Sequence, residues 1–214
     1  MSSAPIKSSA GNSRPAILDD SPLPLNRYLV YFGLAAIGYT IDLVTKEAVF
    51  RWRGVPGDSP RWWLIKDHFG IETSVNPGAL FGMGAGWWWL FALLAIVALC
   101  GIITWLFVYR AAHDRWITVA LGLVSGGILG NLYDRLGLWN NTGLEPKFHH
   151  GVRDWILFEW KGIPFLEPWP NFNIADSLLV TGAIMLVVHA IIWRENDASE
   201  SAKSQQPAGG SPSR

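Results

Sequence analysis

Four stretches of the chain lack charged side chains for long enough to cross a lipid bilayer. The clearest covers residues 87–109, and residues 116–133 and 177–193 follow with the same character. The fourth, residues 28–45, is apolar but is interrupted by Asp42, and a shorter interfacial segment is the alternative there. A helix rises about 1.5 Å per residue, so about 20 apolar residues span a hydrocarbon core of roughly 30 Å. The pattern predicts four transmembrane helices, and therefore an all-α integral membrane protein.

Composition supports this class and removes several others. Half of the 214 residues are hydrophobic and only 16% are charged, whereas soluble domains carry about a quarter charged residues. The net charge of zero excludes a nucleic-acid binder, which needs a basic surface. The single cysteine, Cys100, excludes a disulfide framework and a cysteine-based metal cluster. Residues 1–24 and 195–214 are polar and rich in Ser, and we expect two disordered tails around a membrane domain at 25–194.

An even number of spans places both termini on the same side of the membrane. The loops 46–86 and 137–175 then share the other side, where most of the unusual polar residues also lie. Lys and Arg are almost evenly divided between the two sides, but the short connection with Arg110 and Arg115 favours a cytoplasmic position for the termini. We therefore expect the polar cluster near the outer face.

The first and third spans carry residues that need an explanation inside a membrane. Asp42 and Lys46 are four residues apart, so they share a helix face and can pair. Ionisable residues at membrane depth usually mark a function, and a structural ion pair is the alternative. Gly122, Gly126 and Gly130 form one stripe, and we expect close helix packing along it.

The two outer loops each contain an ordered segment. Residues 69–76 alternate between apolar and polar, which predicts a half-buried strand in a small extracytoplasmic sheet. The strand leads into a turn at residues 76–78, where Asn76 is either a turn residue or a substrate-binding amide. In residues 151–158, Asp154 heads an apolar, aromatic run, for which we expect an interfacial helix.

Two aspartates adjoin apolar segments on the same side of the membrane, Asp154 and Asp176. Two carboxyl groups in a partly dry site do not both ionise cheaply, and an aspartic protease uses this to activate water and polarise a peptide carbonyl. A cap of the fourth helix is the alternative role for Asp176. His149 and His150 are adjacent in sequence, so their side chains diverge, and we expect no metal site there.

Five motifs in order resemble the lipoprotein signal peptidase family (signal peptidase II), a family of integral membrane aspartic proteases. The resemblance covers about residues 25–194 and rests on these matches: Asp42-x-x-x-Lys46, Asn76-Pro77-Gly78-Ala79-x-Phe81, Gly126-Gly127-x-x-Gly130-Asn131-x-x-Asp134-Arg135, Val152-x-Asp154 and Phe172-Asn173-x-Ala175-Asp176-Ser177.

The resemblance implies that Asp154 and Asp176 are the catalytic pair. It implies a substrate site shaped or supported by Asp42, Lys46, Asn76, Gly78, Asn131, Arg135 and Asn173. The implied reaction is removal of a prolipoprotein signal peptide just before a diacylglyceryl-modified cysteine, at the outer side of the bacterial cytoplasmic (inner) membrane, with cytoplasmic termini. No metal or organic cofactor is expected, and we expect a monomer whose partners are the lipid-modified substrate and membrane lipid.

The chain departs from the family pattern at two places. The connection 136–151 is longer than usual, and Arg153 replaces the usual apolar residue before the first catalytic aspartate. We expect Arg153 to point toward the lipid headgroups, and the Arg- and Trp-rich segment 51–68 to contact lipid or substrate. Two other functions remain open at this stage: a non-catalytic membrane protein that binds the same lipidated peptides, and a small transporter that uses Asp42 and Asp176 for proton coupling.

Overall fold

Four helices dominate the computed structural model, which describes residues 21–78, 84, 86–140, 142–160, 162 and 169–204, with backbone alone from 193 onward. The helices are α1 (Leu25–Arg53), α2 (Trp88–Ile103), α3 (Arg115–Arg135) and α4 (Ile174–Ser204), and α2 continues as a π-helical turn, η3 (Thr104–Val108). Each contains a segment long and apolar enough to cross a membrane, so the four predicted spans are confirmed in these terms. Most of the segments predicted as tails lie outside the described residues, although α4 continues to Ser204.

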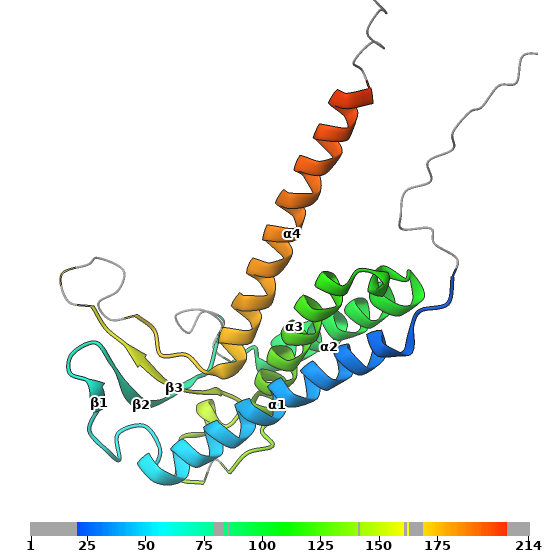
Figure 1. The fold of residues 1–214 in the computed structure, drawn as a ribbon. Helices are drawn as coiled ribbons and strands as arrows, with labels where there is room; N and C mark the ends of the chain where they lie inside the picture. Colours follow the sequence, from blue (N-terminus) through cyan, green and yellow to red (C-terminus); the bar gives the residue numbers. More distant parts are fainter. Residues whose placement is uncertain are drawn as a thin grey trace, which may run out of the picture.

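The helix α3 is the centre of the bundle, with α1 and α4 packed against it (Figure 1). Glycines make this close packing possible. A Cβ atom on Gly126 would lie 3.1 Å from the Ala35 carbonyl oxygen of α1, and one on Gly127 would lie 2.5 Å from the Ala175 carbonyl oxygen of α4. The predicted packing role of the stripe at 122, 126 and 130 is confirmed, because all three glycines face α1.

A three-stranded antiparallel sheet lies at one end of the bundle (Figure 1). Its strands are β1 (Trp62–Ile65), β2 (Phe69–Asn76) and β3 (Val152–Phe158), in the order β1-β2-β3. The predicted strand at 69–76 is confirmed with the same bounds. The register between β2 and β3 shifts once, because Ile71 pairs with Ile156 whereas Ser74 pairs with Asp154. The extra residue in β2 is a β-bulge, and bulges often re-aim side chains beside functional sites.

The interfacial helix expected at 151–158 is wrong, since these residues form β3. Val152 and Ile156 are almost completely buried and Leu157 has no exposed surface, so the strand is covered on both faces. A strand buried on both faces loses the polar alternation that identifies strands, and a short apolar run then resembles the buried side of a helix. Pairing with β2, which is distant in sequence, decides the conformation.

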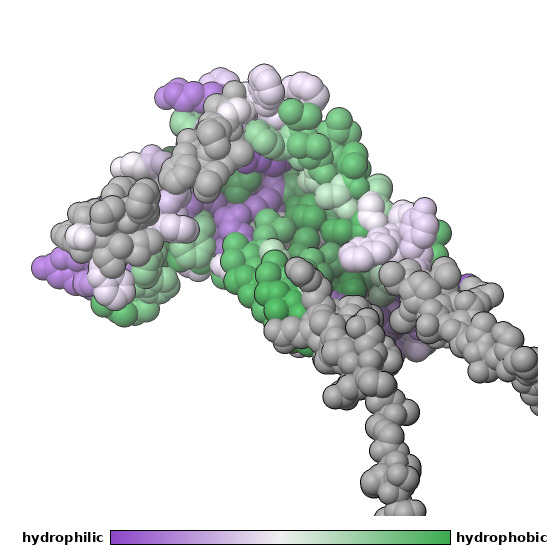
Figure 2. Space-filling view, turned by 90° about the horizontal axis from the view of Figure 1, so that it is seen from above, coloured by the Kyte–Doolittle hydropathy of each residue, from purple (hydrophilic) through white to green (hydrophobic). Residues whose placement is uncertain are grey.

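In the described part of the chain, the connections before α3 and before β3 each contain one short 3-10 helix. The 3-10 helix η4 (Ala111–His113) joins α2 to α3, and Asp114 caps α3 by accepting hydrogen bonds from the backbone N–H groups of Trp116 and Ile117. A second 3-10 helix, η5 (Pro146–Phe148), lies in the long connection before β3. Seen from above, the molecule has a recess with hydrophilic residues at its base and hydrophobic residues around it (Figure 2).

Candidate active site

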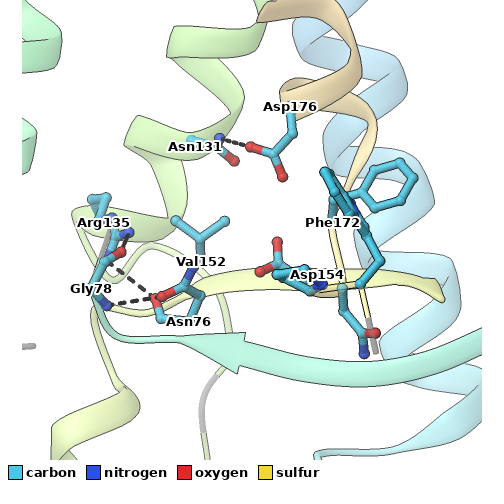
Figure 3. A pocket seen from close by; sticks show the side chains of 11 residues that line it. Asn76, Gly78, Asn131, Arg135, Val152, Asp154, Phe172 and Asp176 are labelled. Carbon is cyan, nitrogen blue, oxygen red and sulfur yellow. Dashed lines mark hydrogen bonds between the residues drawn. The ribbon is translucent and has the colours of Figure 1, made fainter. Parts of the chain in front are cut away.

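A pocket of about 300 Å³ lies where β2, α3, β3 and the start of α4 meet (Figure 3). It brings together most of the predicted site residues, which come from segments far apart in the sequence. The residues that line it are Asn76, Gly78, Asn131, Arg135, Val152, Asp154, Trp169, Pro170, Asn171, Phe172 and Asp176. Three further predicted residues, Asp42, Lys46 and Asn173, lie behind this wall and hold it.

Asp154 enters the pocket from β3 and is only 4% exposed. Its Oδ1 accepts a hydrogen bond of 2.7 Å from the Asn173 side-chain amide. Burial raises the pKa of the Asp154 carboxyl well above its usual range, and the negative charge of Asp176 raises it further. The positive charge of Lys46 and the hydrogen bond from Asn173 offset part of this rise. The raised pKa favours the protonated form of the Asp154 carboxyl group.

Asp176 lies in the first turn of α4 and takes part in a reciprocal cap with Asn173. The Asp176 Oδ2 accepts from the Asn173 backbone N–H at 3.1 Å, and the Asn173 Oδ1 accepts from the Asp176 backbone N–H at 2.9 Å. The Oδ1 of Asp176 accepts a further hydrogen bond from the Asn131 amide at 2.9 Å. These hydrogen bonds hold the Asp176 carboxyl group in one orientation at the start of α4. Asp176 therefore takes part in the cap of α4, which was its alternative role, and its side chain also faces the pocket.

Two asparagine amides connect the two aspartates. The Asn173 Nδ2 donates to Asp154 and also lies 3.2 Å from the Asn131 Oδ1, while the Asn131 Nδ2 donates to Asp176. Lys46 fixes the orientation of Asn131, because its ammonium group donates to the Asn131 Oδ1 at 3.0 Å and an ammonium group only donates. The predicted site residues Asn173 and Asn131 therefore form one chain of hydrogen bonds from Asp154 to Asp176, and Lys46 binds this chain at Asn131.

The charged residues behind this chain are fully buried. Lys46 lies 2.7 Å from the Asp42 carboxylate and 3.1 Å from that of Asp134, and none of the three side chains is exposed. The other Asp42 oxygen accepts from the backbone N–H of Ala175 at 2.9 Å, next to Asp176. The expected pairing of Asp42 with Lys46 is confirmed, and Asp42 also fastens the start of α4.

At the other side of the pocket, Arg135 fastens the turn that follows β2. Its guanidinium group donates to the backbone carbonyl oxygens of Asn76 and Gly78. The Asn76 side chain accepts from the backbone N–H of Gly78 at 3.0 Å, so Asn76 is a turn residue that also lines the pocket. Residues 79–83, which include part of the second family motif, lie outside the described residues.

Arg153 does not point to the lipid headgroups, and that expectation is wrong. Its side chain is almost fully buried and forms two hydrogen bonds to Asp134, while its Nη1 lies 3.2 Å from Glu47. A buried carboxylate such as that of Asp134 is strongly destabilising without a cationic partner, which favours an inward position of the Arg153 side chain over contact with lipid headgroups. The arginine partner of Asp134 was missed because nothing local in the sequence links positions 134 and 153.

The part of the chain that the structure describes contains no cluster of three or more histidine, cysteine or acidic residues that could hold a metal ion. His149 and His150 diverge, as expected. The His150 ring stacks on Trp88 with a centroid distance of 3.9 Å, whereas His149 contacts the carbonyl oxygen of Leu144. The polar groups that line the pocket are carboxyl, amide and guanidinium groups.

A helical protein with four membrane-competent segments and two aspartates in one pocket defines the class: a multi-pass membrane protein with a candidate hydrolytic site. Residues 34–192 match the sequence profile of the family described as Signal peptidase (SPase) II. A lipoprotein signal peptidase of Rhodopirellula baltica is 48% identical over 213 residues, which cover 97% of this chain and 92% of that protein. A lipoprotein signal peptidase of Rhodococcus jostii is 34% identical over 83% of this chain and 80% of its own.

This chain belongs to the signal peptidase II family and is a peptidase, as its motifs predicted. Two solved structures of bacterial membrane enzymes share its fold, each with a TM-score of 0.60. They are 23% and 24% identical to it, and they cover 79% and 89% of this chain.

Proposed function

We propose that this protein removes signal peptides from diacylglyceryl-modified prolipoproteins, with Asp154 and Asp176 as its catalytic pair. One observation carries the assignment of the pair. The two carboxyl groups face the same pocket and are joined through the Asn131 and Asn173 amides. Family membership supports the reaction and the substrate class.

The surroundings of the two carboxyl groups assign them different roles. Asp154 keeps a proton because it is buried, and its Oδ1 already accepts from Asn173, so the proton belongs on Oδ2. From there it hydrogen-bonds the scissile carbonyl oxygen. Asp176, supplied with N–H donors, is the ionised partner that accepts a proton from the attacking water. Asp176 then passes this proton to the leaving amine nitrogen as the C–N bond of the tetrahedral intermediate breaks, which releases a carboxylic acid and an amine.

The position of the pocket suits a substrate anchored in lipid. Asp176 begins a membrane-competent helix, and apolar side chains such as Val180 and Ile184 are exposed on the following turns. The acyl chains of the substrate would stay in the bilayer while the peptide enters the polar recess seen in Figure 2. In this proposal the termini are cytoplasmic, the pocket lies near the outer face of the bacterial inner membrane, and the enzyme acts as a monomer.

The test is cleavage of a diacylglyceryl-modified prolipoprotein by the purified protein in detergent micelles, with the unmodified precursor as a substrate control. We expect the lipidated precursor alone to be cleaved, and Asp154→Asn and Asp176→Asn each to abolish cleavage. Asp114→Asn is a matched control, because Asp114 also caps a membrane-competent helix but lies at the opposite end of α3. Cleavage by either active-site variant at the wild-type rate would contradict the assignment.

These two active-site variants, together with a change at Asp42, distinguish the protease from the two other functions. A non-catalytic binding protein would keep its function in both variants. A transporter would lose coupling when Asp42 is changed and would tolerate Asp154→Asn. Asp42 has its carboxylate engaged by Lys46 and by the Ala175 N–H, which favours a structural role for it.

A further inference from the structure

Arg153 occupies the position directly before Asp154, yet its side chain leaves the strand on the other side. Asp154 lines the active-site pocket, whereas Arg153 lines a separate cavity of about 450 Å³ with Glu47 and Trp139. Arg153 therefore does not touch a substrate held between the aspartates. Any influence on the reaction has to pass through the groups that it holds.

The Asp134 carboxylate binds both the side chain and the backbone N–H of Arg153. The Asp134 Oδ1 accepts from the guanidinium Nε at 3.0 Å and Nη2 at 2.8 Å, and the Oδ2 accepts from the backbone N–H at 3.0 Å. On the other side of the same residue, the Arg153 carbonyl oxygen accepts from the Asn173 amide at 3.3 Å. The backbone of Arg153, directly before Asp154, is thus held at both its N–H and its carbonyl oxygen.

The enlarged connection before β3 covers the arginine. Trp139, from this connection, is 6% exposed, and its ring lies 5.1 Å from the Arg153 guanidinium carbon. Phe50 of α1 packs edge-on against Trp139 at a centroid distance of 5.8 Å. An aromatic face attracts a cation, so Trp139 stabilises the buried guanidinium group of Arg153.

Charge balance connects Arg153 to the asparagine bridge. Asp134 is shared by two cations, Arg153 and Lys46, and Lys46 also serves Asp42 and the Asn131 Oδ1. Without Arg153 the buried Asp134 carboxylate would have Lys46 as its remaining cation, and Lys46 would be drawn away from Asn131. Asn131 would then lose the donor that fixes its orientation toward Asp176.

We propose that Arg153, gripped by Asp134 and covered by Trp139, is a positioning residue that holds Asp154 in place and keeps Lys46 directed at Asn131. The proposal rests on the proposed function, and it assigns a purpose to the enlarged connection: to bury this arginine.

The test compares Arg153→Met with Arg51→Met in the cleavage assay, per molecule of folded enzyme. Arg51 is a matched control because it also pairs with Glu47, but its side chain is 79% exposed and does not contact Asp134. We expect Arg153→Met to lower kcat at least tenfold with KM within about twofold, and Arg51→Met to change neither. If the wild type cleaves the substrate and Arg153→Met has the same kcat, this inference is overturned and the proposed function stands. If the wild type does not cleave the substrate, the proposed function is overturned.

The pH profile separates positioning from a merely structural role. The charged groups that face Asp154 are Lys46 from α1, Asp134 and Arg135 from α3, and Asp176 from α4. Removing Arg153 leaves Asp134 with one cationic partner instead of two, so its negative charge acts more strongly on Asp154 and the alkaline limb of the kcat profile should move to higher pH. A profile that does not move overturns the proposal, whatever the loss of amplitude.

Arg153→Lys provides the second variant, since it keeps the charge and is expected to fold even where the methionine variant does not. A lysine cannot bind Asp134 through two nitrogens while also reaching Glu47. We expect the wild-type pH profile with a kcat several-fold below wild type. If the methionine variant does not fold, a wild-type kcat in Arg153→Lys overturns the proposal.

Discussion

Asn173 contributes both to the stability of α4 and to the orientation of Asp154. Its Oδ1 caps α4 and its Nδ2 donates to Asp154 at 2.7 Å. Replacing it with Ser removes the amide donor but keeps a capping oxygen, whereas Ala removes both. The two variants therefore separate the effect of the cap from the effect of the donor.

The expected magnitudes follow from these contacts. Asp154 is neutral in the proposed mechanism, and a hydrogen bond between neutral groups contributes about 0.5–1.5 kcal/mol, so its loss should lower kcat by roughly 2- to 13-fold in both variants. Loss of the cap costs about 1 kcal/mol, which lowers Tm by about 2–4 °C in a chain of this size, and only Asn173→Ala should show it. Because the Asn173 hydrogen bond lowers the pKa of Asp154, both variants should also move the alkaline limb of the rate to higher pH.

The assay measures kcat and KM for the lipidated precursor across pH, together with the thermal unfolding of each variant in the same detergent. Full activity in Asn173→Ser would refute the reasoning, because it would show that the cap is sufficient and that the amide donor does not orient Asp154.

Two further predictions concern stability. Folding raises the pKa of Asp154, so the folded state keeps a proton that the unfolded state has released, and wild-type stability falls as pH rises toward the raised value. Asp154→Asn has no carboxyl group to titrate at this position, so the Tm of the variant should rise relative to that of the wild type as pH rises. A difference in Tm between the two proteins that does not change with pH would contradict the raised pKa. Gly127→Ala would place a Cβ atom 2.5 Å from the Ala175 carbonyl oxygen and should cost about 1–3 kcal/mol and lower activity, because α4 must shift. Gly101→Ala, with no neighbouring atom within 4 Å, is the control, and equal effects of the two changes on Tm would contradict the packing argument.

The membrane-competent helices and the strand at 69–76 were predictable from sequence because their signals are local. An uncharged run of sufficient length and an alternating pattern each reflect the surroundings of one segment. The glycine stripe of α3 was predictable for the same reason, since small residues four apart mark one helix face.

The errors arose where contacts between distant segments decide the structure. β3 depends on pairing with β2, and neither its apolar composition nor Asp154 at its head indicates that partner. The burial of Arg153 depends on Asp134 and Trp139, whose positions relative to it follow only from the tertiary fold. Family motifs supplied the site residues, but the hydrogen-bond chain through Asn131 and Asn173 became visible only in three dimensions.

The central claim is that Asp154 and Asp176 act as one catalytic unit, and a double-mutant cycle tests it most directly. The single-turnover cleavage rate is measured for Asp154→Asn, Asp176→Asn and the double variant, all shown to be folded. We expect each single variant to lose on the order of 10³-fold or more, and the double variant to be no slower than either single, because residues that act as a unit are not additive. Independent, multiplicative losses, or substantial activity in one single variant, would contradict the claim.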